Sequence, residues 1–366
     1  MKVEFEKLIV CAREIFEKAG VPGEEAQIVA EELAMANMMG VDSHGVLRIP
    51  QYLDEMKSGQ IKPGVSMEIV KETPVTAILD CKQNFGQVGA RKMVDIVEEK
   101  AKKNFMACAL SLNANHIGRL GSYTEELARR GLIAFGTVGV YSVGPMAPWG
   151  AMEPKLGTNP ISWAVPRKGH DPLVMDCATT VVAEGKLRAY VQNGKQVPEG
   201  WIKDGYGNDT TNPLDFYAEP KGSIMPMGGK ISGAKGSGLA IMADMFSVVL
   251  ANDDYWSWEK NGGVRYAENS VYLMALNPEA FYGRDVYEEQ CEVHAQFIKN
   301  AKPAEGVKEV LLPGEFEQNM AAKRKAEGIE LADNTWEGLI EIAQGLGCKW
   351  SEGLEVSKKE NRFVGY

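Results

Sequence analysis

The hydrophobic pattern of the chain changes at Pro63-Gly64, and this change constrains the fold more than any other feature of the sequence. Before it, the apolar side chains of residues 3–19 and 22–39 repeat with the 3.6-residue period of an amphipathic helix. Gly20 and Gly40 stand where these two helices are expected to end. After the change, alternating and continuous apolar runs of strand length follow. The sequence therefore predicts a helical N-terminal segment joined to an α/β region.

The run from Met106 to Leu112 is apolar throughout, which is typical of a central strand whose two faces are both covered. Val75 to Asp80 is expected to form the strand before it, and a helix is expected to follow the Gly86-Gln87-Val88-Gly89 turn between the two strands. Further expected strands cover residues 132–140, 161–165, 173–176 and 271–276, and further helices cover residues 122–130, 287–302 and 336–346. This succession indicates an α/β fold.

A mixture of reactive side chains occupies the stretch from Asp42 to Tyr52, just before and within a predicted third helix. His44 can exchange a proton near neutral pH, and Arg48 can hold a carboxylate with two parallel hydrogen bonds. Ser43 and Tyr52 can orient a hydroxyl group. The stretch therefore suggests a small-molecule site at a helix corner. The residues alone leave open a plainer interpretation, in which Ser43 or Asp42 caps the helix and His44 is only solvated.

A second polar cluster, Asn113 to Gly121, follows directly on the predicted central strand and contains His116. In open α/β sheets, ligands commonly bind beyond the carboxyl ends of strands. His116 is therefore a second candidate for the site, with a hydrogen-bonded loop histidine as the alternative.

Two glycine-rich segments are candidates for ligand contact. Residues 141–160 are irregular and rich in Gly and Pro, which is typical of a binding loop. Gly228 to Gly238 is expected to be a loop that leads into an apolar helix from Leu239 to Leu250. Such a loop can cradle phosphates, and Lys235 adds a positive charge. Neither the Walker pattern nor the dinucleotide fingerprint matches it, so a tight connection with close backbone packing is the alternative.

The composition excludes several classes of protein. The net charge of -10, without a long basic run, argues against a nucleic-acid binder. No stretch approaches the ~20 apolar residues of a membrane span, and the charged N-terminus lacks the apolar run of a secretory signal. The six cysteines are scattered without a C-x-x-C pair, which predicts reduced thiols in a cytoplasmic protein and no metal site. His294 is expected to be an ordinary surface residue.

These motifs match those of a known family, in the same order and over roughly residues 1 to 350. The chain resembles the type-2 malate/L-lactate dehydrogenase family, which includes ureidoglycolate, sulfolactate and 2,3-diketogulonate oxidoreductases. The matching segments are Asp42 to Tyr52, Asn115-His116-Ile117-Gly118-Arg119, Pro148-Trp149-Gly150, Gly157-Thr158-Asn159-Pro160, Asp176 to Thr180, Pro198-Glu199-Gly200-Trp201, Lys235-Gly236-Ser237-Gly238 and Leu312-Pro313-Gly314-Glu315.

The resemblance implies an α/β, non-Rossmann nicotinamide-binding fold, with a mixed β-sheet flanked by helices and a helical domain built from the two ends of the chain. The expected divisions are a helical substrate-side segment (1–65), a mixed-sheet NAD(P)-binding domain (66–300) and C-terminal helices that return to the N-terminal segment (301–366). The family usually forms homodimers. Departures from its pattern are Cys177, where Met is common, the stretch 253–266 with its aromatic cluster Tyr255, Trp256 and Trp258, and the polar tail 351–366.

The resemblance also implies roles for single residues. His44 is similar to the proton donor and acceptor, Arg48 to the anchor for the substrate carboxylate, and His116 to a substrate-side histidine. Ser43 and Tyr52 are expected to contact the substrate. The residues expected to line the dinucleotide are Met175, Asp176, Cys177, Ala178, Thr179, Thr180, Ala234, Lys235, Pro313, Gly314 and Glu315.

The function implied is hydride transfer between NAD(P)H and the C2 carbon of a small 2-oxo or 2-hydroxy acid, with NADH slightly favoured over NADPH. The alternative within the family is reduction of a cyclic imino acid such as a piperideine-2-carboxylate. A binding protein that kept the fold without catalysis is a third hypothesis. The joint presence of His44, Arg48 and His116 argues against that third hypothesis.

Overall fold

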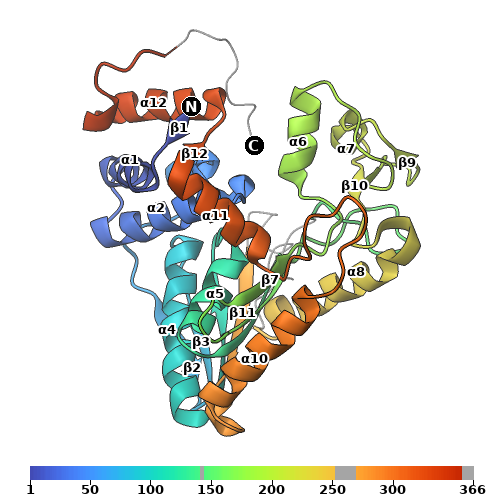
Figure 1. Cartoon of the computed structure of the whole chain (residues 1–366). Helices are drawn as coiled ribbons and strands as arrows, with labels where there is room; N and C mark the ends of the chain where they lie inside the picture. The colour runs from blue at the N-terminus through green and yellow to red at the C-terminus, as the bar shows by residue number, and fades with distance from the viewer. Residues whose placement is uncertain (141–143, 252–268, 357–366) are drawn as a thin grey trace.

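A seven-stranded mixed sheet forms the centre of the protein (Figure 1). The structure, a computed structural model, describes residues 1–140, 144–251 and 269–356. Along the sheet the strands follow the order β2 (Glu68–Glu72), β3 (Thr76–Asp80), β4 (Met106–Leu112), β11 (Asn269–Leu276), β5 (Ile133–Val140), β6 (Ile161–Val165) and β7 (Leu173–Cys177). The β3–β4 pair is parallel, and the other neighbours are antiparallel. The expected mixed, non-Rossmann sheet is confirmed.

The strand at the centre of this sheet comes from late in the chain. β11 lies between β4 and β5 and pairs antiparallel with both, from Tyr272 opposite Leu110 and Thr137. The apolar run Met106–Leu112 is therefore an interior strand, as expected. The edge strand β2 was not predicted, because all five of its residues are exposed and no side of it carries an apolar pattern.

Helices cover both faces of the sheet. α4 (Gly86–Asn104) and α5 (Leu120–Arg129) pack on one face and bury an apolar cluster that includes Met93, Leu127 and Leu273. α8 (Gly229–Asp244) and the π-helical turn η3 (Met245–Val249) contact the other face. There Phe246 meets Tyr272 edge to face, with ring centroids 5.6 Å apart. α10 (Arg284–Lys299) lies at the side of the molecule and holds the exposed His294, which agrees with the surface position expected for it.

The two ends of the chain build one helical layer. α1 (Phe5–Lys18), α2 (Gly23–Met38), α3 (Ile49–Ser58) and α12 (Asp333–Leu346) share an apolar cluster. β1 (Lys2–Val3) pairs antiparallel with β12 (Ile329–Glu330), and α11 (Glu315–Glu327) runs beside them (Figure 1). This is the expected helical part formed by both termini. Its boundaries at residues 65 and 300 stay a prediction, since packing alone does not define independent units.

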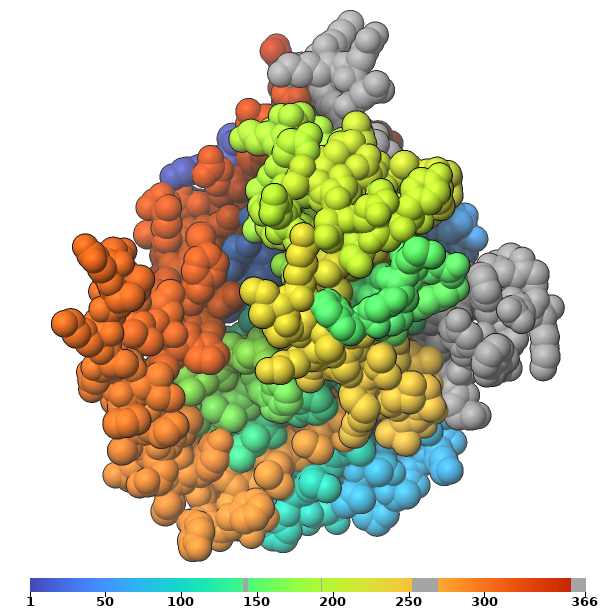
Figure 2. All heavy atoms as spheres, turned by 90° about the vertical axis from the view of Figure 1, so that its right-hand side faces the viewer, coloured from blue at the N-terminus to red at the C-terminus, as the bar shows by residue number. Residues whose placement is uncertain are grey.

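A small unit with its own apolar cluster stands apart from the main sheet, and its yellow-green atoms form the upper part of the face in Figure 2. It contains α6 (Glu184–Gln192), α7 (Leu214–Tyr217) and a three-stranded sheet of β8 (Ile202–Lys203), β9 (Asp209–Thr210) and β10 (Ser223–Ile224). The turn at residues 204–208 joins β8 to β9 and is closed by the Asp204 amide donating to Asn208 O. The helix α6 was not predicted.

The expected loop from Gly228 to Gly238 is wrong, because this stretch is already helical. α8 begins at Gly229 and continues to Asp244, with a kink at Ser232. Its glycines serve close packing instead. A Cβ on Gly233 would lie 2.5 Å from Trp149, and one on Gly236 would lie 2.3 Å from the Met227 carbonyl oxygen. The alternative of a tightly packed connection is therefore closer to the structure than a phosphate loop.

Other expectations concern the cysteines, membrane-spanning helices, metal sites and two segments outside the described residues. The six cysteines are free thiols, and Cys11, Cys81 and Cys348 are buried. Across the described ranges, no helix has the length and apolarity to span a bilayer, and no group of His, Cys, Asp and Glu side chains is arranged to hold a metal ion. The aromatic cluster of Tyr255, Trp256 and Trp258 and the tail from residue 357 lie outside the described residues.

Candidate active site

The corner between α2 and α3 is built from two short 3₁₀ turns, Asp42–His44 and Val46–Arg48, after which α3 begins at Ile49 with Pro50 in its first turn. The buried side chain of Asn37 holds these turns together. Its Oδ1 accepts the Val46 amide at 2.8 Å, and its Nδ2 donates to Asp42 at 2.7 Å. Gly45 is required at this point, since a Cβ there would lie 2.2 Å from Asn37 Oδ1.

Asp42 is fixed by the C-terminal part of the chain. Its carboxylate receives Nη1 and Nη2 of Arg324 on α11, at 2.7 and 3.0 Å. It therefore braces the corner and is not the group that orients His44. That group is Ser43, whose Oγ is hydrogen-bonded to His44 Nδ1 at 3.0 Å.

The loop after β4 brings His116 to the same place. The neighbouring Asn115 is fully buried, and its Nδ2 donates to three backbone carbonyls, those of Gln60, Gln83 and Asn84. The first residue of α4, Gly86, lies directly against this loop. A Cβ on Gly86 would lie 2.1 Å from the Asn115 carbonyl oxygen and 2.5 Å from that of His116. The loop is therefore fixed to the segment after α3 and to the start of α4.

The structure brings His44 and His116 together in a stacked arrangement. Their ring centroids are 5.4 Å apart, and the ring planes are inclined by 21°. The hydroxyl of Tyr52 lies 2.7 Å from Nδ1 of His116 and accepts a hydrogen bond from Gln87 Nε2 at 2.8 Å. Each imidazole is thus held through Nδ1, which leaves Nε2 as the nitrogen available to a ligand.

Arg48 supplies the charge of the site. Its Nε donates to the Ser43 carbonyl at 2.8 Å, and its Nη1 donates to Gln51 Oε1 at 2.6 Å. Gln51 in turn donates to Glu55 at 2.7 Å. These bonds orient the guanidinium from the first turns of α3, so that the cation lies near both imidazoles.

Burial and this cation keep both imidazoles neutral. Burial, followed by the charges of Arg48 and Arg119, lowers the pKa of His44 to about 4. Burial, Arg48 and His44 also lower the pKa of His116 well below its ordinary value. The pKa of His44 thus lies below the near-neutral value expected from the sequence, and its role as proton donor and acceptor stays a prediction. The difference arises because the sequence does not show the desolvation of the rings.

A buried charge network connects the histidine loop to β7. Arg119 lies 3.1 Å from Glu125 and 3.6 Å from Asp176, and Asp176 also accepts the Gly121 amide at 2.9 Å. Gly121 leaves room for this contact, because a Cβ there would lie 2.6 Å from Asp176 Oδ2. Asp176 is thus engaged with the loop that carries His116.

The residues expected to line the dinucleotide come from β7, the segment after it, the start of α11 and α8. The Val174 amide donates to Pro313 O at 3.1 Å, and Gly314 packs on Val174, which places Pro313-Gly314-Glu315 beside this strand. On the other side, Met227 donates its amide to Thr179 O at 2.7 Å, just before α8. The remaining members of the set are Met175 and Cys177 on β7, Ala178 and Thr180 after it, and the exposed Ala234 and Lys235 on α8.

Sequence reasoning missed three contributors to the site. Gln87 supports Tyr52, and Gln51 supports Arg48. The first turn of α6 lies against the corner, where a Cβ on Gly185 would be 3.5 Å from Ser43 Cβ. A glutamine near a helix start carries no sequence signal of its own, and α6 was not recognised as a helix.

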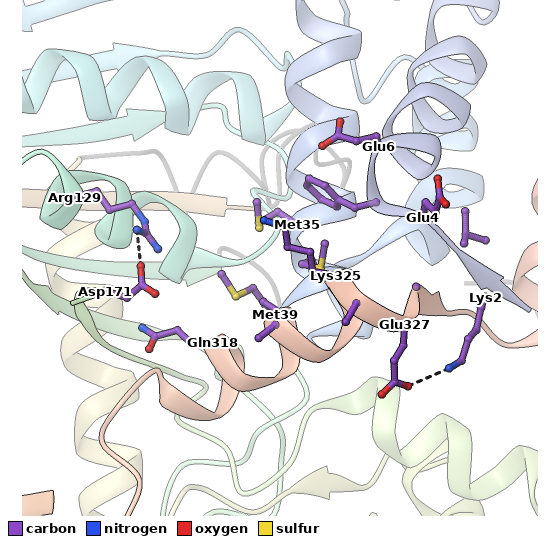
Figure 3. A pocket seen from close by; sticks show the side chains of 17 residues that line it. Lys2, Glu4, Glu6, Met35, Met39, Arg129, Asp171, Gln318, Lys325 and Glu327 are labelled. Carbon is purple, nitrogen blue, oxygen red and sulfur yellow. Dashed lines mark hydrogen bonds and ion pairs between the residues drawn. The ribbon is translucent and has the colours of Figure 1, made fainter. Parts of the chain in front are cut away.

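Two open grooves lie away from the histidines. One, of about 850 Å³, has Met35 and Met39 on its floor and Lys2, Glu327 and Arg129 among its charged side chains (Figure 3). The other, of about 670 Å³, lies between α3 and α12. Neither is lined by any of the predicted site residues.

The sequence matches a known family over nearly its full length. Residues 3–340 match the family model described as malate/L-lactate dehydrogenase. An L-sulfolactate dehydrogenase from Methanocaldococcus jannaschii is 34% identical over 359 residues, which are 97% of this chain and 99% of that protein.

Solved structures share the fold. A malate dehydrogenase from Entamoeba histolytica superposes with a TM-score of 0.88 and 26% identity, covering 95% of this chain and 98% of that chain. A delta1-piperideine-2-carboxylate reductase from Pseudomonas syringae pvar. tomato superposes with a TM-score of 0.81 and 27% identity, covering 94% of this chain and 100% of that one.

The lowered pKa of His44 predicts a pH-dependent loss of stability. An unfolded histidine takes up its proton near pH ~6.5, whereas the folded His44 remains neutral down to about pH 4. Between these values the unfolded chain binds more protons, so the free energy of unfolding falls as the pH falls. Above pH ~6.5 the ring is neutral in both states and contributes nothing.

Urea unfolding of the wild type and His44→Gln across this pH range measures the effect. We expect a shallower fall in the variant, and His294→Gln, at an exposed position, serves as the control. Carboxylates titrate equally in the wild type and in both variants, so the effect of His44 is the difference in pH dependence between the wild type and His44→Gln. If the free energy of unfolding falls equally steeply with pH in the wild type and in His44→Gln, the lowered pKa of His44 is contradicted.

Proposed function

The chain belongs to the malate/L-lactate dehydrogenase family, and from this membership we propose that it transfers a hydride between a nicotinamide cofactor and C2 of a small 2-oxo or 2-hydroxy acid. It is an oxidoreductase of the malate, lactate and sulfolactate dehydrogenase type. The observation that carries the finer proposal is the stacked pair His44 and His116 beside Arg48. Two proton-exchanging rings next to one oriented cation suit a substrate with a carboxylate beside a reacting oxygen.

Arg48 is the proposed anchor for the substrate carboxylate. Its guanidinium is oriented by Ser43 and Gln51, and a planar guanidinium can hold a carboxylate bidentately. An anion bound there would also offset the positive charge that helps to lower the pKa of both histidines. Carboxylate binding would therefore bring the rings closer to a pKa useful for proton transfer at neutral pH.

His44 is the proposed proton donor in reduction and acceptor in oxidation. Reduction of a carbonyl puts a hydride on carbon and leaves negative charge on oxygen, so an acid must deliver a proton to that oxygen. Ser43 holds Nδ1 of His44, and the 3₁₀ turn Val46–Arg48 places Arg48 four residues further along the chain. His116 is the rival for the same duty, since the two rings are stacked at one point.

The proposed cofactor is NAD or NADP, with NADH slightly favoured, and it supplies the hydride when bound. The proposed lining residues are those named above on β7, after it, at the start of α11 and on α8. Two of their features fit a dinucleotide: the exposed ammonium of Lys235, and the N-terminal turn of α11 that follows Gly314. Lys235 offers a positive charge to phosphates, and the first turn of α11 offers backbone amides, where the carboxylate of Glu315 is already paired with Lys299. Titration of NADH and NADPH against the Lys235→Ala variant checks this placement, and unchanged affinities would refute it.

We also propose that the protein is a cytoplasmic homodimer. α8 and η3 expose Met242, Met245, Phe246 and Val249 at a spacing that puts them on one helix face, each of them 41–57% exposed. Such a contiguous apolar stripe is typical of a protein–protein interface. A monomeric mass in solution by light scattering would refute the dimer.

A second function within the family is reduction of a cyclic imino acid. The structural similarity to a piperideine-2-carboxylate reductase favours it as the alternative. Such a substrate would use the same carboxylate anchor, because it also carries a carboxylate next to the carbon that accepts the hydride. The two candidates differ in the reacting atom, which is oxygen in one and nitrogen in the other.

A substrate panel tests the proposal directly. We expect purified protein to oxidise NADH or NADPH with at least one 2-oxo acid, such as oxaloacetate, pyruvate or sulfopyruvate, more efficiently than with a piperideine-2-carboxylate. The measurement is kcat/KM from the loss of nicotinamide absorbance. Faster turnover of the imine would select the alternative, and no turnover with any member of the panel would favour a binding protein without catalysis.

Substitution of each histidine separates their roles. His44→Ala should lower kcat by roughly 10²–10⁴-fold, the range for losing a general acid, while NADH still binds. Steady-state kinetics and a fluorescence titration of NADH measure the two effects. If His44→Ala turns over normally and His116→Ala is inactive, the roles are reversed.

Replacement of Arg48 by lysine tests the carboxylate anchor. Arg48→Lys keeps a positive charge but loses the planar pair of donors. We expect a higher KM for the oxo acid with nearly unchanged affinity for NADH. Arg13→Lys, at an exposed position on α1, makes the same substitution away from the site and is the control for general effects on folding. A normal KM in Arg48→Lys would show that Arg48 has a structural role instead.

A further inference from the structure

Arg324 on α11 joins the end of α2 to the turn that follows it. Its Nη1 donates both to the Asn37 carbonyl and to Asp42 Oδ1, and its Nη2 donates to Asp42 Oδ2 at 3.0 Å. Asn37 lies in the last turn of α2, where carbonyl groups carry partial negative charge and favour a cation. Asp42 is the first residue of the 3₁₀ turn that contains His44. One guanidinium therefore holds both sides of the point where the chain turns.

The hydrogen bonds that start at Asp42 lead into the second 3₁₀ turn as well. Asp42 Oδ1 accepts from Asn37 Nδ2 at 2.7 Å, and Asn37 Oδ1 accepts the Val46 amide at 2.8 Å. The second turn, Val46–Arg48, is thus connected to the carboxylate that Arg324 holds. A displacement of this carboxylate would therefore displace both turns.

Met320, one helical turn before Arg324, covers the same part of the chain. Gly40 follows α2 with a left-handed backbone (φ +81°), and a Cβ there would lie 2.9 Å from Met320 Cγ. A left-handed residue after a helix changes the direction of the chain. α11 therefore lies against the point at which the chain leaves α2, and Arg324 fixes the direction in which it continues.

The first turn of α11 is fixed to the sheet, so that the helix reaches from β7 to the helical layer (Figure 1). Gln318 donates from Nε2 to the Pro172 carbonyl at 3.0 Å, and Glu315 accepts from Lys299 on α10 at 2.5 Å. All thirteen residues of α11 are described, and none of them is buried. Polar contacts at its two ends thus contribute much of what holds this helix in place, as in a brace.

A plainer interpretation is an ordinary surface ion pair, which would tolerate replacement. Two observations argue against it. The Arg324 side chain is only 14% exposed, although that of Asp42 is 46% exposed. Arg324 also holds both carboxylate oxygens and a main-chain carbonyl at once. A bidentate bond fixes orientation as well as distance.

We propose that Arg324 is a positioning residue for the reaction, which places His44 and Arg48 correctly for the substrate by holding Asp42 and the end of α2. The inference rests on the proposed function for the roles of His44 and Arg48. Arg324 acts through the backbone of the corner between α2 and α3 and does not itself contact the substrate. Its effect on the rate is large because a misplacement of roughly 1 Å can lower a rate on the order of 10²-fold.

Kinetics of Arg324→Met test this role. Methionine keeps much of the side chain and loses every donor. We expect kcat/KM for the oxo acid to fall about 10²-fold, through a lower kcat and a higher KM together, because His44 and Arg48 are displaced together. The affinity for NADH, measured by fluorescence titration, should stay unchanged. Arg324→Lys keeps the charge without the planar pair of donors and should recover part of the loss.

The matched control is Arg130→Met. Arg130 follows α5, at the end away from the His116 loop, and its 27% exposed side chain is paired with Asp95, Glu98 and Glu126. This variant removes an equally well paired arginine, so it should lower the free energy of unfolding without changing kcat or KM. If Arg324→Met loses no more activity than Arg130→Met, the proposal is overturned.

A double substitution tests the route of the effect. If Arg324 acts through Asp42, the loss in Asp42→Asn combined with Arg324→Met should be smaller than the product of the two single losses. Fully independent losses would show that the bond between the two side chains does not position the corner.

NMR of the imidazoles tests the positioning without any substrate. The chain has four histidines, so ¹⁵N-histidine labelling gives a small set of signals, and His44→Gln identifies those of His44. Arg324→Met should shift or broaden the His44 signals and leave those of the exposed His294 unchanged, whereas Arg130→Met should alter neither. Unchanged His44 signals in Arg324→Met would overturn the proposal.

The two measurements separate the positioning role from the proposed function. If the His44 signals change as expected but the wild type turns over no acid, the proposed function fails and the control of the corner by Arg324 stands. If the wild type is active and Arg324→Met keeps its kcat and KM, the proposed function stands and this inference fails. Should Arg324→Met not fold, Arg324→Lys carries both measurements.

Discussion

The structure of the site depends on how the loop after β4 is fixed to the segment after α3 and to the segment before α4. One side chain makes most of this contact, because the amide of Asn115 donates to three backbone carbonyls from these two segments. A buried amide that satisfies several carbonyls at once fixes the loop far more strictly than a single bond would. Through it His116, a residue of the sheet region, is held against His44, a residue of the helical layer. The site thus lies where the two apolar clusters of the chain meet.

Charge is arranged around this contact in two different ways. Arg324 and Asp42 brace the corner from the outside, and Asp42 is half exposed whereas Arg324 is mostly buried, so water reaches this pair from the carboxylate side. Arg119 is buried and contacts two carboxylates, Glu125 and Asp176. Breaking a fully buried pair leaves an uncompensated charge, which costs more free energy than breaking a pair that water can reach. The buried network therefore links β7 firmly to the histidine loop, and with it the residues proposed for the cofactor to those proposed for the substrate.

The sequence predicted the features that follow from local patterns. The period of the apolar residues indicated α1, α2, β4 and β11, and the polar clusters after them contained both His44 and His116. It did not predict the strand β2, which has no buried face, or the helical state of Gly228 to Gly238. In the second case glycine was interpreted as a sign of backbone freedom. Its actual role is to let Trp149 and Met227 approach α8, which depends on contacts distant in the sequence.

The residues of the candidate site were predictable from the sequence, but the protonation states of its two histidines were not. Free imidazoles titrate close to neutral pH, and nothing in the stretch from Asp42 to Tyr52 indicates otherwise. The fold removes water from both rings and adds the charge of Arg48, and both effects disfavour a second proton. Neutral rings must then be distinguished by their tautomers, which their Nδ1 partners control. Ser43 is adjacent to His44 in the chain, whereas Gln87 and Tyr52 reach His116 only in the folded structure. The reactive side chains in the sequence therefore identify the location of the site. The hydrogen-bond partners of each Nδ1, which only the fold brings together for His116, influence which ring nitrogen carries hydrogen.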